Sequence, residues 1–168
     1  TPELKDYVEV PLPQIGVMKS DGPFIAKPDH QEALGFPGEL VDDWENVAVN
    51  KLGDLANRYR GLRVFLDSCV KCGACTDKCH YYLGTTDANN MPVARQDLLR
   101  SVYRYYHTPA GKVLSKLGME KLIGARKLTE DVINEWYNYF HQCSQCRRCS
   151  VFCPYGIDTA EISMAARE

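Results

Sequence analysis

Eight cysteines in two identical blocks constrain this chain more than any other feature of its sequence. Their positions are Cys69, Cys72, Cys75 and Cys79 in the first block, and Cys143, Cys146, Cys149 and Cys153 in the second. Both blocks have the spacing C-x2-C-x2-C-x3-C, and the remainder of the 168 residues contains no cysteine. In this spacing the first three thiolates can bind three corners of an iron–sulfur cubane, while the fourth points towards a second cluster.

Three chemistries can use eight cysteines. Disulfides are disfavoured, because a Cys-x2-Cys pair is poorly spaced for a structural bridge and the chain shows no export signal. A zinc site normally uses two Cys-x2-Cys pairs, whereas each block here places a third cysteine close to such a pair. The spacing instead matches the run of a two-cluster ferredoxin, and it occurs twice. We therefore expect two [4Fe–4S] clusters.

The ligands of the two clusters are expected to cross between the blocks. In ferredoxins with this run, the fourth cysteine of each block ligates the cluster of the other block. One cluster is then assigned to Cys69, Cys72, Cys75 and Cys153, and the other to Cys143, Cys146, Cys149 and Cys79. Because this arrangement joins the two blocks, assembly of the clusters should be coupled to folding.

Charged and polar residues within and beside the blocks leave alternatives open. Lys71, Lys78, Arg147 and Arg148 either offset the negative charge of the clusters or point to solvent. His80 directly follows the first block, where Pro154 follows the second. A packed or solvated histidine is the favoured interpretation, with hydrogen bonding to cluster sulfur as the alternative. Histidine ligation is unnecessary, since eight thiolates complete two cubanes.

The bulk composition suits a small soluble protein. Hydrophobic residues make up 45% and charged residues 25% of the sequence, and the net charge is −2. No apolar stretch approaches the roughly 20 residues needed to span a bilayer, and the N-terminal residues do not form a secretory signal. The sequence has neither a P-loop nor a dinucleotide-binding glycine motif. With no recognised nucleic-acid-binding fold and a near-neutral charge, a nucleic-acid partner is not expected.

The sequence divides into an arm, residues 1–42, and a helical domain, residues 43–168. The arm is acidic and rich in proline, which removes backbone donors and favours extended conformations. It is expected either to be disordered or, the favoured alternative, to lie extended across a partner subunit. Within the domain, residues 91–127 contain eight Lys or Arg and two acids. This excess indicates either attraction to an acidic partner or anionic membrane surface, or a solvated helical face.

The fold class predicted for the domain is all-α, because no segment alternates as a strand does. Helical spacing begins at residue 43 and is expected to end at Gly61. Residues 80–90 are rich in turn formers and predict a loop. Further helices are expected over 92–106, 109–117 and 130–142 and from 159 to the last residue. Pro92, Pro109, Thr129 and Asp158 supply the signals at their starts.

A family resemblance rests on the linkers as well as on the cysteines. The stretches that carry it are residues 65–75, 78–85, 90–93, 98–101, 124–129, 146–150 and 152–162. They resemble the helical ferredoxin domains of heterodisulfide-reductase-like iron–sulfur subunits, and most closely the DsrK family of the membrane-bound Dsr complex of dissimilatory sulfur metabolism. The resemblance covers roughly residues 40–168, and His80 fits this family.

The resemblance implies a subunit on the cytoplasmic side of the cell membrane, peripheral within a redox complex. It implies electron transfer between a membrane cytochrome b and a disulfide or trisulfide of a small, DsrC-like sulfur-carrier protein. In the family, a special cluster held by Cys-Cys-Gly motifs performs that last step. The present sequence has no such motif. We therefore expect it to be the electron-input part of an oxidoreductase whose catalytic part lies elsewhere.

Two rival interpretations make different demands on the chain. An iron–sulfur subunit of the succinate dehydrogenase or fumarate reductase type needs an additional [2Fe–2S] domain with its own cysteines, which this sequence lacks. A zinc-stapled structural module would be colourless, whereas an iron–sulfur protein is brown.

Overall fold

The computed structural model describes residues 29, 33 and 39–168, and this part of the chain is helical without a strand. Its α-helices are α2 (Trp44–Arg58), α3 (Arg60–Ser68), α4 (His80–Thr85), α5 (Pro92–His107), α6 (Pro109–Lys116), α7 (Glu130–His141), α8 (Arg148–Val151) and α9 (Thr159–Arg167). Short 3₁₀ helices are η1 (Thr76–Lys78), η2 (Ala88–Asn90) and η3 (Glu120–Ile123). The all-α prediction is confirmed for these residues. The arm predicted for residues 1–42 lies almost entirely outside them.

Two of the predicted boundaries are wrong. Gly61 does not end a helix but lies in the first turn of α3, and the chain bends two residues earlier at Tyr59, which is extended with φ −108° and ψ 94°. Buried Leu62 and Leu66, one turn apart, give α3 an apolar face that outweighs the low helix propensity of the glycine. The predicted loop over 80–90 instead forms α4 and η2.

The predicted capping signals position the helices around the cysteine blocks. The Thr129 side chain accepts a hydrogen bond from the backbone N–H of Val132 at the start of α7. The Asp158 carboxylate accepts from the N–H groups of Ala160 and Glu161 at the start of α9. Pro92 occupies the first position of α5, where the N–H that proline lacks would have no helical partner.

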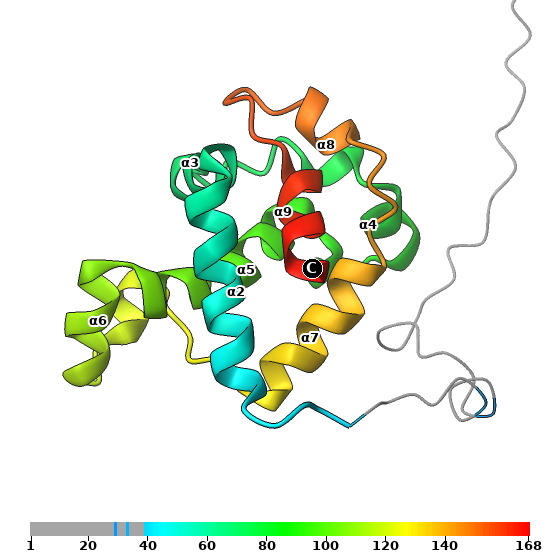
Figure 1. Ribbon diagram of the computed structural model, residues 1–168. Coiled ribbons are helices and arrows are strands. Elements are labelled where there is room, and N and C mark those ends of the chain that lie inside the picture. Colours follow the sequence, from blue (N-terminus) through cyan, green and yellow to red (C-terminus); the bar gives the residue numbers. More distant parts are fainter. Residues whose placement is uncertain (1–28, 30–32, 34–38) are drawn as a thin grey trace, which may run out of the picture.

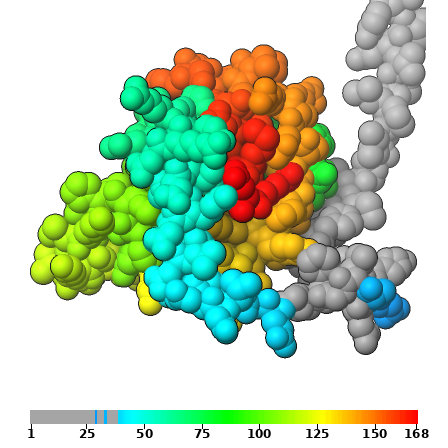
Figure 2. All heavy atoms as spheres, viewed as in Figure 1, coloured from blue at the N-terminus to red at the C-terminus, as the bar shows by residue number. Residues whose placement is uncertain are grey.

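Helices α5 and α9 are the centre of the fold. Helix α9 lies between α2 and α3 on one side and α7 on the other, and α5 packs against α2, α3, α7 and α9 (Figure 1). The core between them contains the fully buried side chains of Leu66, Leu99, Val102, Phe140 and Ile162. Helix α6 and the turn after it project from the body as a separate lobe (Figure 2).

The basic stretch predicted over residues 91–127 is not one exposed surface. Arg95 and Arg100 of α5 are almost completely buried, at 2% and 3% exposure. Arg104 is half-buried and donates to the carbonyl of Ile123. The solvated-face interpretation is therefore wrong for these arginines, which hold backbone inside the fold. Among the described residues, no helix is long and apolar enough to cross a bilayer.

Candidate metal centre

The eight cysteine thiols surround two separate cavities. Cys69, Cys72, Cys75 and Cys153 line the first, which we call the Cys69 cavity. Cys79, Cys143, Cys146 and Cys149 line the second, which we call the Cys143 cavity. Their empty spaces, partly open to solvent, are similar in size at about 340 and 380 Å³. Each cavity thus collects three thiols from one block and the fourth from the other, the grouping expected from the spacing.

All eight cysteines are free thiols in the structure. Within residues 39–168 no set of three His, Cys, Asp or Glu side chains is arranged around a single metal ion. The thiols instead line the walls of two cavities, four to each. Four soft sulfur donors per cavity are the ligand set of a [4Fe–4S] cluster.

The two blocks share positive φ values at two equivalent positions. Lys71 and Gly73 in the first block have positive φ values of 57° and 79°. Gln145 and Arg147, which lie 74 positions later, have φ values of 57° and 59°. A chain that repeatedly adopts this conformation turns consecutive N–H groups towards one concave side, where they can bind an anion. The Gln145 N–H already donates to Cys143 Sγ at 3.4 Å, so the loops fit an anionic cluster.

Two arginines hold the backbone at the start of the blocks. Arg100 of α5 donates to the carbonyl oxygens of Leu66, at 2.7 Å, and Cys69, at 2.5 Å. Arg167 of α9 donates to the carbonyl oxygens of Phe140 and Cys143. Phe140 and Cys143 stand 74 positions after Leu66 and Cys69. Each arginine therefore satisfies the carbonyls left without partners where a helix ends and a block begins.

A third arginine reaches a thiol directly. Arg95 of α5 donates from Nε to the carbonyl of Tyr139, at 2.8 Å, and from one terminal nitrogen to Asn90 Oδ1, at 2.6 Å. Its other terminal nitrogen lies 3.7 Å from Cys79 Sγ. Sequence reasoning missed the roles of Arg95, Arg100 and Arg167. The only available signal was their place beside apolar residues on the inward faces of α5 and α9.

Thr159 lies between the two cavities and lines both. Its hydroxyl group is hydrogen-bonded to Cys149, and together with Ser150 it moderates the increase in the pKa of that thiol caused by burial. Burial and the neighbouring Cys149 raise the pKa of Cys75 to about 11. Cys75 and Cys149 are therefore close enough for their charges to interact, and metal binding at these thiols has to displace their protons.

The residues around the blocks are placed as follows. His80 is exposed, with Nδ1 3.9 Å from Cys146 Sγ and Nε2 3.3 Å from Ser144 Oγ, so it touches the second block rather than standing apart in solvent. The cations of the blocks form surface ion pairs: Lys71 with Asp97 at 2.8 Å, Lys78 with Asp77 at 2.7 Å and Arg147 with Asp158 at 3.5 Å. Arg148 is exposed.

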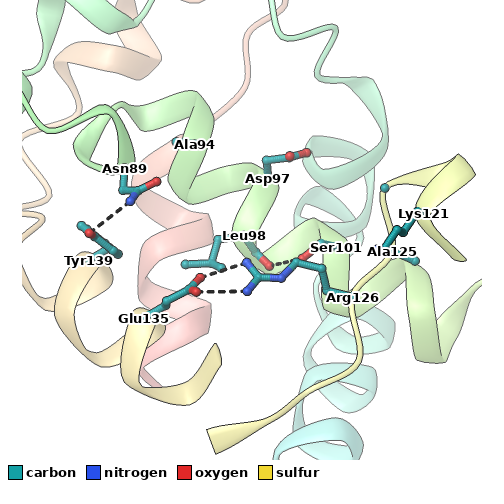
Figure 3. Close-up of a pocket in the computed structure, with 11 residues that line it drawn as sticks. Asn89, Ala94, Asp97, Leu98, Ser101, Lys121, Ala125, Arg126, Glu135 and Tyr139 are labelled. Carbon is teal, nitrogen blue, oxygen red and sulfur yellow. Dashed lines mark hydrogen bonds and ion pairs between the residues drawn. The ribbon is translucent and has the colours of Figure 1, made fainter. Parts of the chain in front are cut away.

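A third cavity, of about 850 Å³ on the same measure, lies between α5, η3 and α7 (Figure 3). Arg126 crosses it and forms a double ion pair with Glu135, at 2.9 and 3.0 Å. Asn89 donates to the hydroxyl of Tyr139 at its other end. The residues that line it include no cysteine. The metal chemistry of the described residues therefore belongs to the two thiol-lined cavities.

Comparison with protein families settles the nature of the cofactor. Residues 65–157, more than half of the chain, match the family described as a 4Fe-4S dicluster domain. The chain belongs to this family. It therefore holds two [4Fe–4S] clusters, as the spacing predicts, and the disulfide and zinc interpretations are wrong. The two cavities described above are the candidate sites of these clusters, because together they contain every cysteine of the chain.

Several curated relatives point to one type of protein. The chain is 55% identical over 124 residues to the "Hdr-like menaquinol oxidoreductase iron-sulfur subunit 2" of Archaeoglobus fulgidus, covering 74% of this chain and 21% of the relative. It is 53% identical over 129 residues to the corresponding protein of Archaeoglobus profundus, covering 77% and 22%. It is 29% identical over 102 residues to one chain of the dihydromethanophenazine:CoB–CoM heterodisulfide reductase of Methanosarcina barkeri, covering 61% and 23%. No solved structure matches the chain.

The chain thus spans about a fifth of the length of the relatives it matches. The resemblance to heterodisulfide-reductase-like iron–sulfur subunits is confirmed at that level, together with electron transfer through [4Fe–4S] clusters. The narrower assignment to the DsrK family stays a prediction.

Proposed function

We propose that this chain is the electron-input part of a heterodisulfide-reductase-like subunit, and that it passes electrons between two [4Fe–4S] clusters with crossed ligands. The observation that carries the proposal is the grouping of the thiols. Each cavity takes three cysteines from one block and one from the other. The outer thiols Cys72 and Cys146 are exposed, while Cys75 and Cys149 are half-buried and close enough for their charges to interact. Electrons can therefore enter at one exposed edge, cross between the inner thiols and leave at the other edge.

The partners follow from the relatives and remain part of the proposal. Relatives named as menaquinol oxidoreductase subunits support a membrane cytochrome b that supplies electrons from a quinol. Relatives named as heterodisulfide reductase subunits support an acceptor with a disulfide or trisulfide bond, such as a small sulfur-carrier protein. We place the chain on the cytoplasmic side of the membrane. The reduction of the acceptor is assigned to residues outside this chain, because the two clusters use all eight cysteines.

The crossing can be tested with a matched pair of variants. Cys79→Ser should alter the spectrum of the cluster bound by the second block, and Cys153→Ser should alter that of the cluster bound by the first. Serine offers an oxygen ligand in place of the thiolate, so each variant can still assemble its altered cluster. The cluster whose ligands are unchanged serves as an internal control. Electron paramagnetic resonance of the reduced chain, reconstituted with iron and sulfide, measures both clusters. Damage confined to the cluster of the variant's own block would refute the crossing.

The conduction role needs a separate experiment. The reconstituted chain should accept electrons from a low-potential reductant and pass them to an artificial acceptor. It should not reduce a protein disulfide, because all eight cysteines are assigned as cluster ligands. Measurable disulfide turnover by this chain would contradict the assignment of catalysis to another segment.

A further inference from the structure

The two cavities differ in one buried cation that reaches a thiol, because the buried Arg100 beside Cys69 bonds to backbone carbonyls. Arg95 is 2% exposed, and its side chain is fixed by the carbonyl of Tyr139 and the amide oxygen of Asn90. Both are neutral acceptors. Within residues 39–168 no carboxylate lies at ion-pair distance from Arg95, whereas the neighbouring Arg100 has Asp97 at 3.9 Å. A buried cation without an anion is strongly unfavourable.

A negatively charged metal centre in the Cys143 cavity would supply this anion. The Arg95 guanidinium lies 3.7 Å from the sulfur of Cys79, which lines the Cys143 cavity. A cubane bound by four thiolates is negatively charged. Its presence gives Arg95 a counter-charge inside the protein, and Arg95 gives the cluster a charged hydrogen-bond donor. The two are therefore stabilised together.

The Cys69 cavity has no counterpart of Arg95 among the described residues that line it. Arg100 and Arg167 play the same role in the two halves and are 67 positions apart. The same offset from Arg95 leads to Ile162, which is fully buried and carries no charge. The residues that line the Cys143 cavity also include Lys78 and Arg147. Among the described residues that line the Cys69 cavity, there is no Lys or Arg.

We propose that the cluster in the Cys143 cavity has the higher reduction potential and that Arg95 is the residue mainly responsible. Reduction adds an electron to a cluster that is already negative, so a nearby cation and a donor to its sulfur favour the reduced state. Lys78 and Arg147, whose side chains are 34% and 60% exposed, contribute less, because each is paired with a carboxylate and screened by water.

This order of potentials sets the direction of electron transfer. An electron arriving at the cluster in the Cys69 cavity moves to the cluster in the Cys143 cavity, which holds the electron when the chain carries only one. The inference rests on the proposed crossing of ligands, because it needs Cys79 to belong to the second block's cluster.

The order can be measured in the unmodified chain. A potentiometric titration followed by electron paramagnetic resonance gives two midpoint potentials, and two matched variants assign them. Cys72→Ser and Cys146→Ser replace equivalent exposed ligands of the two clusters. We expect Cys146→Ser to change the signal of the cluster that is reduced first, and Cys72→Ser to change the second. The reverse assignment would overturn the inference.

The role of Arg95 is tested by Arg95→Gln and Arg95→Lys. Arg95→Gln should lower the reduction equilibrium constant of the first-reduced cluster at least tenfold, which for one electron is about 59 mV. The other cluster should change less than threefold, and Arg95→Lys should recover part of the loss because it keeps the charge. The control is Arg126→Gln, which removes an exposed arginine, and it should move neither potential. Equal shifts in both clusters would show a merely structural effect and contradict the proposal.

Failure of this inference can be told apart from failure of the proposed function. If Cys79→Ser damages the cluster of its own block, the crossing is wrong, and the inference is overturned with it. If the crossing holds and the Cys143 cluster is reduced second, only the inference is overturned. Should Arg95→Gln fail to assemble clusters, the order measured in the unmodified chain still decides.

Discussion

The arginines that hold the start of each block offer the sharpest test of how the fold supports the clusters. We consider Arg100→Met and Arg167→Met, which keep much of the side-chain volume but remove the guanidinium group. Arg100 donates to the carbonyls of Leu66 and Cys69, and Arg167 to those of Phe140 and Cys143. Each variant leaves two carbonyls at a helix end without their charged donor.

The expected magnitude follows from those two hydrogen bonds. A hydrogen bond to a charged group contributes about 1.5–3 kcal/mol, so two give roughly 3–6 kcal/mol. Part of this is recovered, because Cys69 and Cys143 are only half-buried and water can reach their carbonyls. A net loss of about 2–4 kcal/mol in the free energy of local opening corresponds to an opening constant raised about 30- to 700-fold.

Release of iron to a ferrous chelator measures this opening one cluster at a time. Arg100→Met should accelerate loss of the cluster in the Cys69 cavity, and Arg167→Met that of the cluster in the Cys143 cavity. Arg126→Met serves as the control, since its ion pair with Glu135 is exposed and contributes about 0–1 kcal/mol. Acceleration of the same cluster by both variants, or less than threefold acceleration by either, would refute the assigned roles.

Three further predictions concern the scaffold and are checked by thermal or denaturant unfolding. Gly111→Ala should lose at least about 2 kcal/mol, because its Cβ would lie 1.8 Å from the Arg104 carbonyl oxygen, while Gly84→Ala, with open space around it, should lose nothing. Asp158→Ala should cost about 1–2 kcal/mol, and Asp158→Asn less, because the carboxylate caps α9 and accepts from Ser150. Burial lowers the pKa of His107, so stability should be full above the unfolded-state pKa of about 6.5 and should decrease as the pH falls through it. His107→Gln should lack this pH-dependent loss, and an identical slope in both proteins would exclude His107 as its source.

The cofactor could be predicted from the sequence because cysteine spacing is a local property. The C-x2-C-x2-C-x3-C run determines which thiols share a short loop, and the thiols gather around two cavities in the grouping that this spacing predicts. The helix caps could also be predicted, since the side chains of Thr129 and Asp158 accept hydrogen bonds from N–H groups two or three residues away. The caps required no knowledge of how distant segments pack, whereas the crossing of ligands between the blocks rests on the pattern of two-cluster ferredoxins and stays a prediction.

The roles of the arginines as donors to backbone carbonyls could not be predicted, because those carbonyls lie far away in the sequence. Arg100 bonds to carbonyls 31 and 34 positions earlier, and a charged residue read alone suggests a solvated side chain. The equivalence of Arg100 and Arg167 is also concealed. The cysteines repeat after 74 positions and these arginines after 67, because the segment with α4 and η2 makes the first half longer. The helix end predicted at Gly61 is wrong for a related reason. The burial of Leu62 and Leu66 stabilises α3 through this glycine, and that packing depends on distant segments.

The exchange of one cysteine between the blocks has a consequence for synthesis of the protein. If the ligands cross as proposed, the first block cannot complete its cluster until Cys153 has been made. A ribosome adding roughly 5–20 residues per second needs about 4–15 s to travel from Cys79 to Cys153. During that interval a cluster placed on the first block would have one iron open to water and oxygen. Insertion of both clusters after the domain is complete avoids this hazard. With crossed ligands, a cluster obtains its fourth thiolate only once both blocks have been made and brought together.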